Sequence, residues 1–366
     1  MCLILFWLID MTANDAPPDA RDMASGPQVS VVIPSYNHAA FLEDCIRSVQ
    51  SQTLTRWELI IIDDGSTDNS RNIIQAFAGR DARIKYVFQE NSGASHAINR
   101  GLGMARSEYL SILNSDDRYH PHRLETLWNV CNGGNIRFLT TGVHLINASG
   151  DSVPAGHPWL VQYARILQSV QENGLLRGLF FGNYTVSTSN FFFHRSAWAL
   201  LGEIPHLRFN HDWAYAARAL SILGKDYDFL ADEKLLDYRL HGNNTINSNP
   251  IRSRLELYRL QRQMAGHFGG DIEFLVRCIH ANQRSLRREV AHLRLVPVYE
   301  SLAAANQRMD EQALQLDQAG HEMNCLKQAL ATSESELKGV LESKTYRLGR
   351  ILTSPYRWVA SKIRQK

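Results

Sequence analysis

The chain has 366 residues, of which 44% are hydrophobic and 21% charged, as in an ordinary globular protein with one large domain and additions, or with two domains. Its net charge of +2 gives no global electrostatic reason to expect a nucleic-acid partner, and we expect none. The five cysteines are scattered, without a Cys-x-x-Cys pair. They indicate reduced thiols in a cytoplasmic protein and argue against a disulfide framework or a zinc site.

The first 27 residues are expected to form a disordered leader. They begin with the apolar run MCLILFWLIDM, which is shorter than the roughly 20 residues of a membrane span. The run lacks a basic segment and a small-residue cleavage site, so a signal peptide is not expected. A weak anchor that touches a membrane is the alternative.

The region 28–250 begins with short apolar runs and amphipathic stretches in alternation. The run VSVVIPSYN is typical of a strand buried on both faces, and residues 39–52 place apolar side chains at helical spacing. The run WELIIIDDGS predicts a second buried strand, after which Ser66 or Thr67 can cap a helix.

The alternation continues with strands in IKYVFQE and YLSIL and a helix over residues 93–105 between them. Strands that alternate with helices indicate a mostly parallel sheet, in which ligands bind outside the carboxyl ends of the strands. Polar residues gather at these ends and can face one another because the strands are parallel: Ser35, Tyr36, Asn37, Asp63, Asp64, Glu90, Asn91, Asn114, Ser115, Asp116 and Asp117.

The region 137–249 is more mixed. IRFLTTGVHLINASGD predicts a strand with a polar turn, and STSNFFFHRSAWALLG predicts a strand that enters a helix. HDWAYAARALSILG predicts a helix with His211 and Asp212 in its first turn. YDFLADEKLLDYRLHGNNTI predicts a strand that ends in a polar loop.

The composition changes after residue 250. Residues 251–300 are rich in Arg and Leu and predict a helical extension. Residues 301–343 carry an apolar a/d heptad that favours a coiled coil, through which the chain could self-associate; a long helix packed on the domain is the alternative. Residues 344–366 hold seven Lys or Arg, no acid and several aromatic side chains, which suits an anionic membrane surface; a solvated basic tail is the alternative.

The acids and amides at the sheet edge indicate a ligand. The sequence has no Gly-x-Gly-x-x-Gly or Walker motif, so dinucleotide and ATP sites lack their usual signals. Acids would repel a diphosphate unless a divalent cation lay between them, and Mg²⁺ and Mn²⁺ bind through a few carboxylates together with substrate phosphates. The residues therefore predict a diphosphate ligand held through Mn²⁺ or Mg²⁺.

Five segments carry a resemblance to a known family: VSVVIPSYNHAAFLEDCIRSVQSQT, WELIIIDDGSTDNS, NSGASHAINRGLGMARSEYLSILNSDD, HDW and YRLHGNNT. In this order and spacing they resemble the family-2 glycosyltransferases of the GT-A fold, over residues 29–249. The resemblance implies a Rossmann-like α/β fold and transfer of a sugar from a nucleoside-diphosphate donor. The C-terminal coiled coil and basic tail are similar to those of enzymes that build bacterial surface polysaccharides.

The resemblance also implies a set of residues that bind the nucleotide-sugar. Pro34 and Tyr36 match the positions that pack on the nucleotide base, and Asp64 matches a base contact. Asp63 is expected to touch the ribose or simply to end its strand. Gly93 is placed in the same donor-binding set, as are the two residues that precede Asp116.

Asp116 matches the acid of the Asp-x-Asp motif that holds the metal, and His241 a late ligand of the metal or the diphosphate. The first position of that motif is Asn114 here, followed by Ser115, so one negative charge is missing. Asn114 can still accept a hydrogen bond from the ribose or ligate through its carbonyl, and Asp117 is expected to replace part of the charge. The alternative for Asp116 is a cap of the helix predicted in HPHRLETL.

Asp212 matches the family's catalytic base, which takes the proton of an acceptor hydroxyl. The alternative is an acid favourably placed at a helix N-terminus. No role is predicted for His38, His96, His120 or His122.

The expected function is that of an inverting glycosyltransferase with a UDP- or dTDP-linked donor. Its acceptor is expected to be a saccharide or a lipid-linked saccharide at the inner face of the cytoplasmic membrane, where the protein would be peripheral. A sugar nucleotidyltransferase would need a Gly-rich basic loop after the first strand, where this chain has PSYNHAAF. A non-catalytic scaffold is the other alternative, suggested by Asn114 and disfavoured by Asp116 and Asp212.

Overall fold

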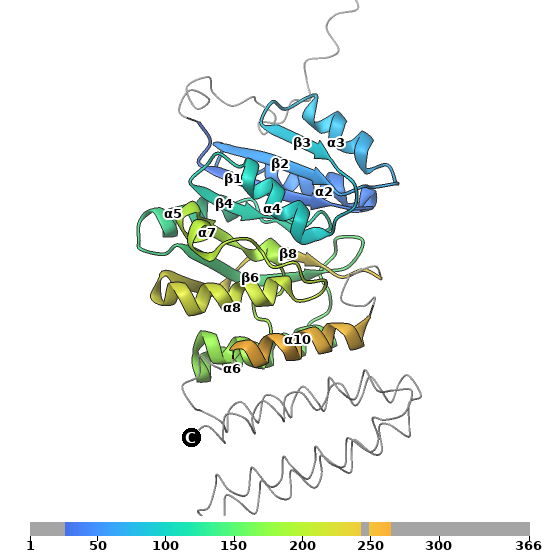
Figure 1. Cartoon of the computed structure of the whole chain (residues 1–366). Coiled ribbons are helices and arrows are strands. Elements are labelled where there is room, and N and C mark those ends of the chain that lie inside the picture. The colour runs from blue at the N-terminus through green and yellow to red at the C-terminus, as the bar shows by residue number, and fades with distance from the viewer. Residues whose placement is uncertain (1–25, 243–248, 265–366) are drawn as a thin grey trace, which may run out of the picture. The chain divides into compact units, whose positions relative to one another are not determined.

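The computed structural model describes residues 26–242 and 249–264. Within these residues an eight-stranded sheet lies among helices, in the order β3-β2-β1-β4-β7-β6-β8-β5 (Figure 1). The strands are β1 (Val29–Ser35), β2 (Trp57–Asp63), β3 (Ile84–Phe88), β4 (Tyr109–Ile112), β5 (Arg118–Tyr119), β6 (Phe138–Ile146), β7 (Phe192–His194) and β8 (Tyr227–Arg239). The helices of this domain are α2 (Ala39–Gln50), α3 (Ser70–Ala78), α4 (Ala94–Met104), α5 (Arg123–Asn132), α6 (Pro158–Phe181), α7 (Arg195–Leu201) and α8 (His211–Leu223), with the short 3-10 helices η1 (Thr188–Asn190) and η2 (Gly224–Asp226).

The directions of the strands bring distant segments to one edge of the sheet. Four of the seven pairings among the described strands are parallel, which confirms the mostly parallel sheet. Strand β7 runs antiparallel to both β4 and β6, so β6 has the same direction as β4, and β8 is parallel to β6. The carboxyl ends of β1, β2, β4 and β8 therefore point toward the same edge, where the predicted site residues follow them.

The continuous apolar runs of β1 and β2 are buried on both faces, as expected for strands inside a layered α/β domain. Alternate side chains of a strand point to opposite faces. Val29, Val31 and Ile33 share a core cluster with apolar residues of α2, whereas Val32 lies against Gly101 of α4. Helices α2 and α4 therefore cover opposite faces of β1 (Figure 1).

The prediction that Ser66 or Thr67 caps the helix after β2 is wrong. Helix α3 begins only at Ser70, three residues further along the chain, and Asn69 precedes it. The hydroxyl of Ser66 instead accepts a hydrogen bond from the backbone N–H of Asn37, at 3.0 Å. These residues join the loop after β2 to the loop after β1, because the two parallel strands end side by side.

Replacing two glycines of α4 with alanine is expected to change the stability of the protein in opposite directions. A Cβ at Gly101 would lie 2.3 Å from Cγ1 of Val32, a stiff and fully buried side chain, whereas a Cβ at Gly103 meets nothing within 4 Å. We expect Gly101→Ala to lower the free energy of unfolding by about 1–3 kcal/mol through overpacking. Gly103→Ala should raise it by up to about 1 kcal/mol through helix propensity. Urea denaturation of both variants tests this, and equal midpoints would contradict it.

The chain divides into two units, residues 1–242 and 243–366, and the described part of the second is the helix α10 (Pro250–Met264). This helix falls at the start of the predicted helical extension. The predicted leader, coiled coil and basic tail lie outside the described residues, apart from the last two residues of the leader. Across residues 26–242 and 249–264, no helix has both the length and the apolar character that crossing a membrane requires.

Candidate active site

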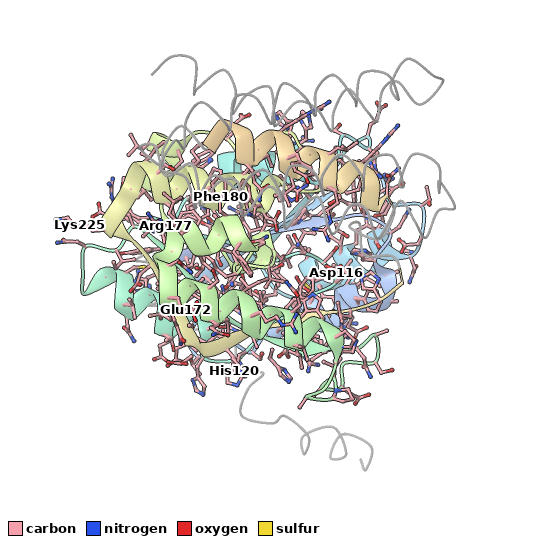
Figure 2. The ribbon with its side chains drawn as sticks, turned by 90° about the horizontal axis from the view of Figure 1, so that it is seen from below. Asp116, His120, Glu172, Arg177, Phe180 and Lys225 are labelled. Carbon is pink, nitrogen blue, oxygen red and sulfur yellow. The ribbon has the colours of Figure 1, made fainter. Side chains whose placement is uncertain are left out.

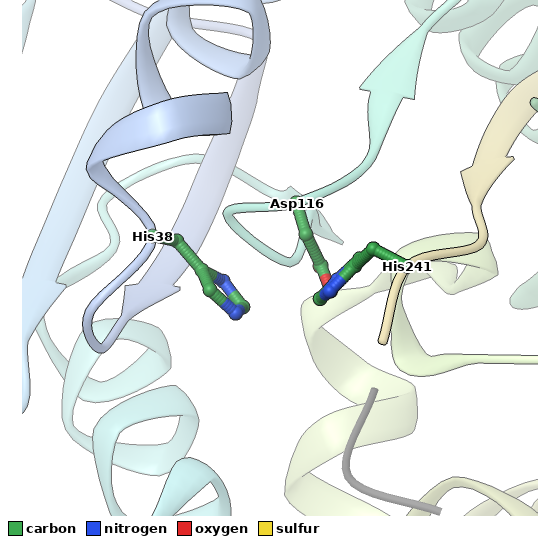
Figure 3. Close-up of side chains that lie close together, drawn as sticks. All are labelled: His38, Asp116 and His241. Carbon is green, nitrogen blue, oxygen red and sulfur yellow. The ribbon is translucent and has the colours of Figure 1, made fainter. Parts of the chain in front are cut away.

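Three segments from different strands meet at the sheet edge: His38 follows β1, Asp116 follows β4 and His241 follows β8. Asp116 is labelled in Figure 2, and Figure 3 shows the side chains of His38, Asp116 and His241 close together. Nε2 of His241 lies 3.0 Å from Oδ2 of Asp116. One potential ligand atom from each of the three residues lies within 4.8 Å of the other two.

The structure excludes the capping alternative for Asp116. Helix α5 begins at Arg123 and is preceded by His122, whereas the carboxylate of Asp116 turns to His241. Burial raises the pKa of Asp116, but the hydrogen bond to His241 and the charges of His38 and His241 lower it by more. The net effect is a pKa below the ordinary value, so this buried group is held as a carboxylate.

The two acids of the motif Asp116-Asp117 face different ways. Oδ2 of Asp117 accepts from the hydroxyl of Ser189 at 2.6 Å, and its Oδ1 accepts from the backbone N–H of Arg239 at 2.9 Å. Burial and the charge of Asp116 raise the pKa of Asp117 well above its ordinary value. The expectation that Asp117 replaces the charge missing at Asn114 is therefore wrong, because its oxygens are bound within the protein.

Asn114 is held by the short helix η1. Its Nδ2 donates to the hydroxyl of Ser187 at 2.9 Å, and its Oδ1 accepts from the hydroxyl of Thr188 at 3.0 Å. Its neighbour Ser115 is buried and lies 2.8 Å from Nδ1 of His38. A contact of either residue with the nucleotide-sugar stays a prediction. The amide of Asn114 would have to make that contact in addition to its hydrogen bonds with Ser187 and Thr188.

The residues predicted to bind the nucleotide lie at the ends of β1 and β2. Pro34 is buried in β1, whereas Tyr36, two residues on, is 47% exposed. Asp63 is fully buried and accepts from the backbone N–H of Ser66 at 3.0 Å, so it ends the strand and fixes the turn. Only its Oδ1 is used in this turn, whereas its Oδ2 is buried without a hydrogen-bond partner, so the ribose contact stays a prediction.

Asp64 organises the loop in front of α4. Oδ1 accepts from the side chain of Gln89 at 2.7 Å and from the N–H of Ser92 at 2.9 Å, and Oδ2 accepts from the N–H of Gly93 at 2.7 Å. Gly93 has φ of 94°, a left-handed conformation that glycine adopts without strain. Asp64 and Gly93 are thus brought together as a unit at the sheet edge, and their contact with the base stays a prediction.

Asp212 lies in the first turn of α8, as predicted, and is buried. Its Oδ2 accepts a hydrogen bond of 2.8 Å from the side chain of Asn183. Burial raises its pKa, and the nearby His211 and the hydrogen bonds from Trp213 and Asn183 offset only part of that rise. A carboxylate with a raised pKa is a better proton acceptor than an exposed aspartate, which suits a general base.

Tyr238, on β8, is influenced by acids from both parts of the candidate site. Burial raises the pKa of its hydroxyl, and the neighbouring acids Asp117, Asp116 and Asp212 raise it further. The predicted base, on α8, and the predicted cation ligand, in the loop after β4, therefore both act on this phenol.

Comparison with known proteins decides the family. Residues 30–198 match the model of glycosyl transferase family 2. TuaG of Bacillus subtilis (strain 168), named as a teichuronic acid biosynthesis glycosyltransferase, is 32% identical over 242 residues, which cover 65% of this chain and 88% of TuaG. The chain belongs to glycosyl transferase family 2. Another relative, glycosyltransferase GlyG of Streptococcus pneumoniae, is 43% identical over 101 residues, only 27% of this chain and 34% of GlyG.

Solved structures agree on the fold of this family-2 glycosyltransferase. Residues 1–349 of S. aureus TarS in complex with UDP-GlcNAc give a TM-score of 0.52 at 18% identity and cover 92% of each chain. The mannosyltransferase PcManGT of Pyrobaculum calidifontis, in complex with GDP-Man and Mn²⁺, gives 0.52 at 17% identity and covers 92% of this chain and 87% of PcManGT. The predicted GT-A, Rossmann-like fold is confirmed, and the nucleotidyltransferase alternative is wrong.

Two site residues of the glycosyltransferase were missed from the sequence. His38 was given no role, yet it stands beside Asp116 and His241. Asn183, which binds the carboxylate of Asp212, lies in no motif that the sequence made visible. The one available signal for His38 was its place, three residues after the end of β1, at the same sheet edge as the acids.

Proposed function

We propose that this family-2 glycosyltransferase moves a sugar from a UDP- or dTDP-linked donor to a hydroxyl of a saccharide or lipid-linked acceptor, with inversion at the anomeric carbon. The observation that carries the proposal is the Asp116–His241 pair at the sheet edge, whose atoms lie 3.0 Å apart, together with Asp212, a buried carboxylate with a raised pKa in the first turn of α8. The name of TuaG supports a role in surface polysaccharide synthesis, and the UDP-GlcNAc and GDP-Man bound by TarS and PcManGT support a nucleoside-diphosphate sugar as donor.

The arrangement of Asp116 and His241 fits a divalent cation. Two adjacent ligands of an octahedral ion, each about 2.1 Å from it, lie about 3.0 Å apart, and the two atoms here are 3.0 Å apart. Both atoms come from side chains that are largely shielded from solvent, with 5% of His241 and 13% of Asp116 exposed. When bound, Mn²⁺ or Mg²⁺ would offset the negative charge of the departing nucleoside diphosphate.

Asp212 is the residue proposed to act on the acceptor. It removes the proton of the acceptor hydroxyl while the oxygen of that hydroxyl attacks the anomeric carbon, on the face opposite the diphosphate. An α-linked donor therefore gives a β-linked product. Asn183 holds one carboxylate oxygen of Asp212 and so fixes the orientation of the proposed base. The acceptor is expected at the inner face of the cytoplasmic membrane, with the segment 344–366 as the membrane contact.

Calorimetric binding of UDP and of dTDP, each with and without Mn²⁺, tests the donor site. We expect binding that depends on Mn²⁺ in the wild type and is lost in Asp116→Ala, which removes the carboxylate. Asp232→Ala, a change of an exposed aspartate on β8, is the matched control and should bind as the wild type does. A folded wild type that binds neither nucleotide, and does not hydrolyse a sugar donor in Mn²⁺, would favour the scaffold alternative.

Tyr36→Ala should weaken nucleotide binding without changing the fold. The ring is 47% exposed at the end of β1, so it can stack on a base, and such stacking contributes about 1–3 kcal/mol per base. We therefore expect the Kd of UDP to rise by about 5- to 150-fold. Tyr86→Ala, which removes an aromatic ring 38% exposed on β3, is the control. Equal Kd values for the two variants would remove Tyr36 from the base site.

A further inference from the structure

His38 is oriented as metal-binding histidines commonly are. Its Nδ1 lies 2.8 Å from the hydroxyl of Ser115, whose side chain is only 2% exposed and therefore fixed. A histidine that ligates a metal through one ring nitrogen usually donates its other N–H to an oxygen, which sets the tautomer. In the tautomer that carries the proton on Nδ1, donation to Ser115 leaves the lone pair of Nε2 for a cation. Figure 3 shows His38 on one side of the site and Asp116 with His241 on the other.

Helix α2 does not need the side chain of His38. His38 precedes the first residue of the helix but makes no capping hydrogen bond with its side chain. The first N–H of the helix, that of Ala39, is satisfied by the carboxylate of Asp68 at 2.9 Å. The imidazole is therefore held at the sheet edge by Ser115 and by neighbouring rings. Phe41 contacts it at a centroid distance of 6.0 Å and contacts the ring of His241 at 4.8 Å.

We infer that His38 is a third ligand of the donor-site cation, and that the resulting two-histidine, one-carboxylate set favours a first-row transition ion such as Mn²⁺ over Mg²⁺. The inference rests on the proposed function, because it concerns the cation of that site. The potential ligand atoms of the three residues lie within 4.8 Å of one another. Two ligands of one octahedral ion, each about 2.1 Å from it, lie about 3.0 Å apart when adjacent and about 4.2 Å apart when opposite. The three atoms are therefore at separations close to those that a shared ion requires.

The chemistry of the donor set gives the selectivity. Mg²⁺ is a hard ion that binds oxygen, keeps several waters and gains little from imidazole. Imidazole nitrogens favour the first-row transition ions, and a set of two histidines and one carboxylate with open positions is a known arrangement for such ions. Asn114 acts in the same direction, because an amide at this position carries no negative charge for a hard ion such as Mg²⁺.

The test uses the full chain, Mn²⁺ alone and Mn²⁺ with UDP, and pulsed electron paramagnetic resonance to count the ring nitrogens bound to Mn²⁺. We expect two nitrogens in the wild type and one each in His38→Gln and His241→Gln. The Kd of Mn²⁺ should rise at least about 10-fold in His38→Gln, comparable with the effects of losing groups that orient ligands. The Kd of Mg²⁺ should change less, so the Mn²⁺ preference falls. His120→Gln is the control, because His120 is exposed and stands apart from Asp116 in Figure 2.

Ser115→Ala adds a second variant that keeps all three ligands. It should retain two bound nitrogens and bind Mn²⁺ about 10- to 100-fold more weakly. Two bound nitrogens and an unchanged Mn²⁺ affinity in His38→Gln would overturn the inference and leave the proposed function intact. A folded wild type that binds no Mn²⁺ in the presence of UDP would overturn both the inference and the cation of the proposed function.

Discussion

Replacing Asp212 with asparagine is expected to lower the rate of sugar transfer by about 10²- to 10⁴-fold, the usual contribution of a general base. Asparagine has nearly the same shape and keeps an oxygen that can accept from Asn183, but it cannot take up a proton. The Kd of UDP should stay unchanged, because Asp212 acts on the acceptor. Steady-state transfer and calorimetric UDP binding measure the two effects. Transfer at the wild-type rate would leave Asp212 as an acid at a helix N-terminus only.

The same residue predicts the pH dependence. A base works only when ionised, and burial raises the pKa of Asp212 above its ordinary value of 3.8. The value of kcat/KM should therefore fall as the pH drops through that raised pKa, at a higher pH than an exposed aspartate would give. Asn183→Ala removes a hydrogen bond that lowers the pKa, so the fall should move to still higher pH. An unmoved acid limb would contradict this assignment.

Asn190→Leu is expected to lower the free energy of unfolding by about 3–5 kcal/mol, at the upper end of single substitutions. The side chain of Asn190 is fully buried. Its Nδ2 donates to the carbonyl oxygens of Thr141 at 2.6 Å and Thr185 at 3.1 Å. Its Oδ1 accepts from the N–H and the hydroxyl of Thr141, each at 3.0 Å, and from Arg123 at 3.2 Å. Leucine has a similar size but makes none of these hydrogen bonds, so the N–H of Thr141 and the carbonyl oxygens of Thr141 and Thr185 each lose a hydrogen bond in the core.

The urea midpoint and thermal unfolding measure this loss. Asn72→Leu is the matched control, because Asn72 is exposed on α3 and makes one side-chain hydrogen bond, to Asn69. It should change stability by no more than about 0.5 kcal/mol. Similar midpoints for the two variants would show that the hydrogen bonds of Asn190 are replaced by water or by rearrangement. The folded fraction of Asn190→Leu should also bind UDP more weakly, since η1 holds Asn114 and Asp117.

The local patterns of the sequence predicted most of the first half of the fold. The runs that became β1, β2 and β4 are apolar on both faces, and helices α2 and α4 have the expected spacing, because both signals are carried by adjacent residues. Helix α6 was not predicted. It is interrupted at Gly174, which has φ of 80°, so its two pieces do not share one periodic face. The 3-10 helix η1 depends on tertiary hydrogen bonds and has no local signal.

The same difference separates the site residues that were predicted from those that were missed. Asp64, Asp116 and Asp212 stand in short motifs, so a match of a few residues was enough. His38 has meaning only through partners far along the chain: Ser115 is 77 residues away, and the Asp116–His241 pair itself joins positions 125 residues apart. A lone histidine in a loop gives no sign of such partners until the strands are ordered in the sheet.

The reversed strand β7 separates two groups of strands at the sheet edge that carries the candidate site. On one side of it lie β1, β2 and β4, with the residues proposed for the nucleotide; on the other lie β6 and β8, with α8 in the same half of the chain. The segment matched by the family model stops at residue 198, soon after β7, so Asp212 and His241 fall beyond it. The two parts of the candidate site thus differ in how far the family match reaches: Asp64 and Asp116 lie inside the matched segment, and Asp212 and His241 lie outside it.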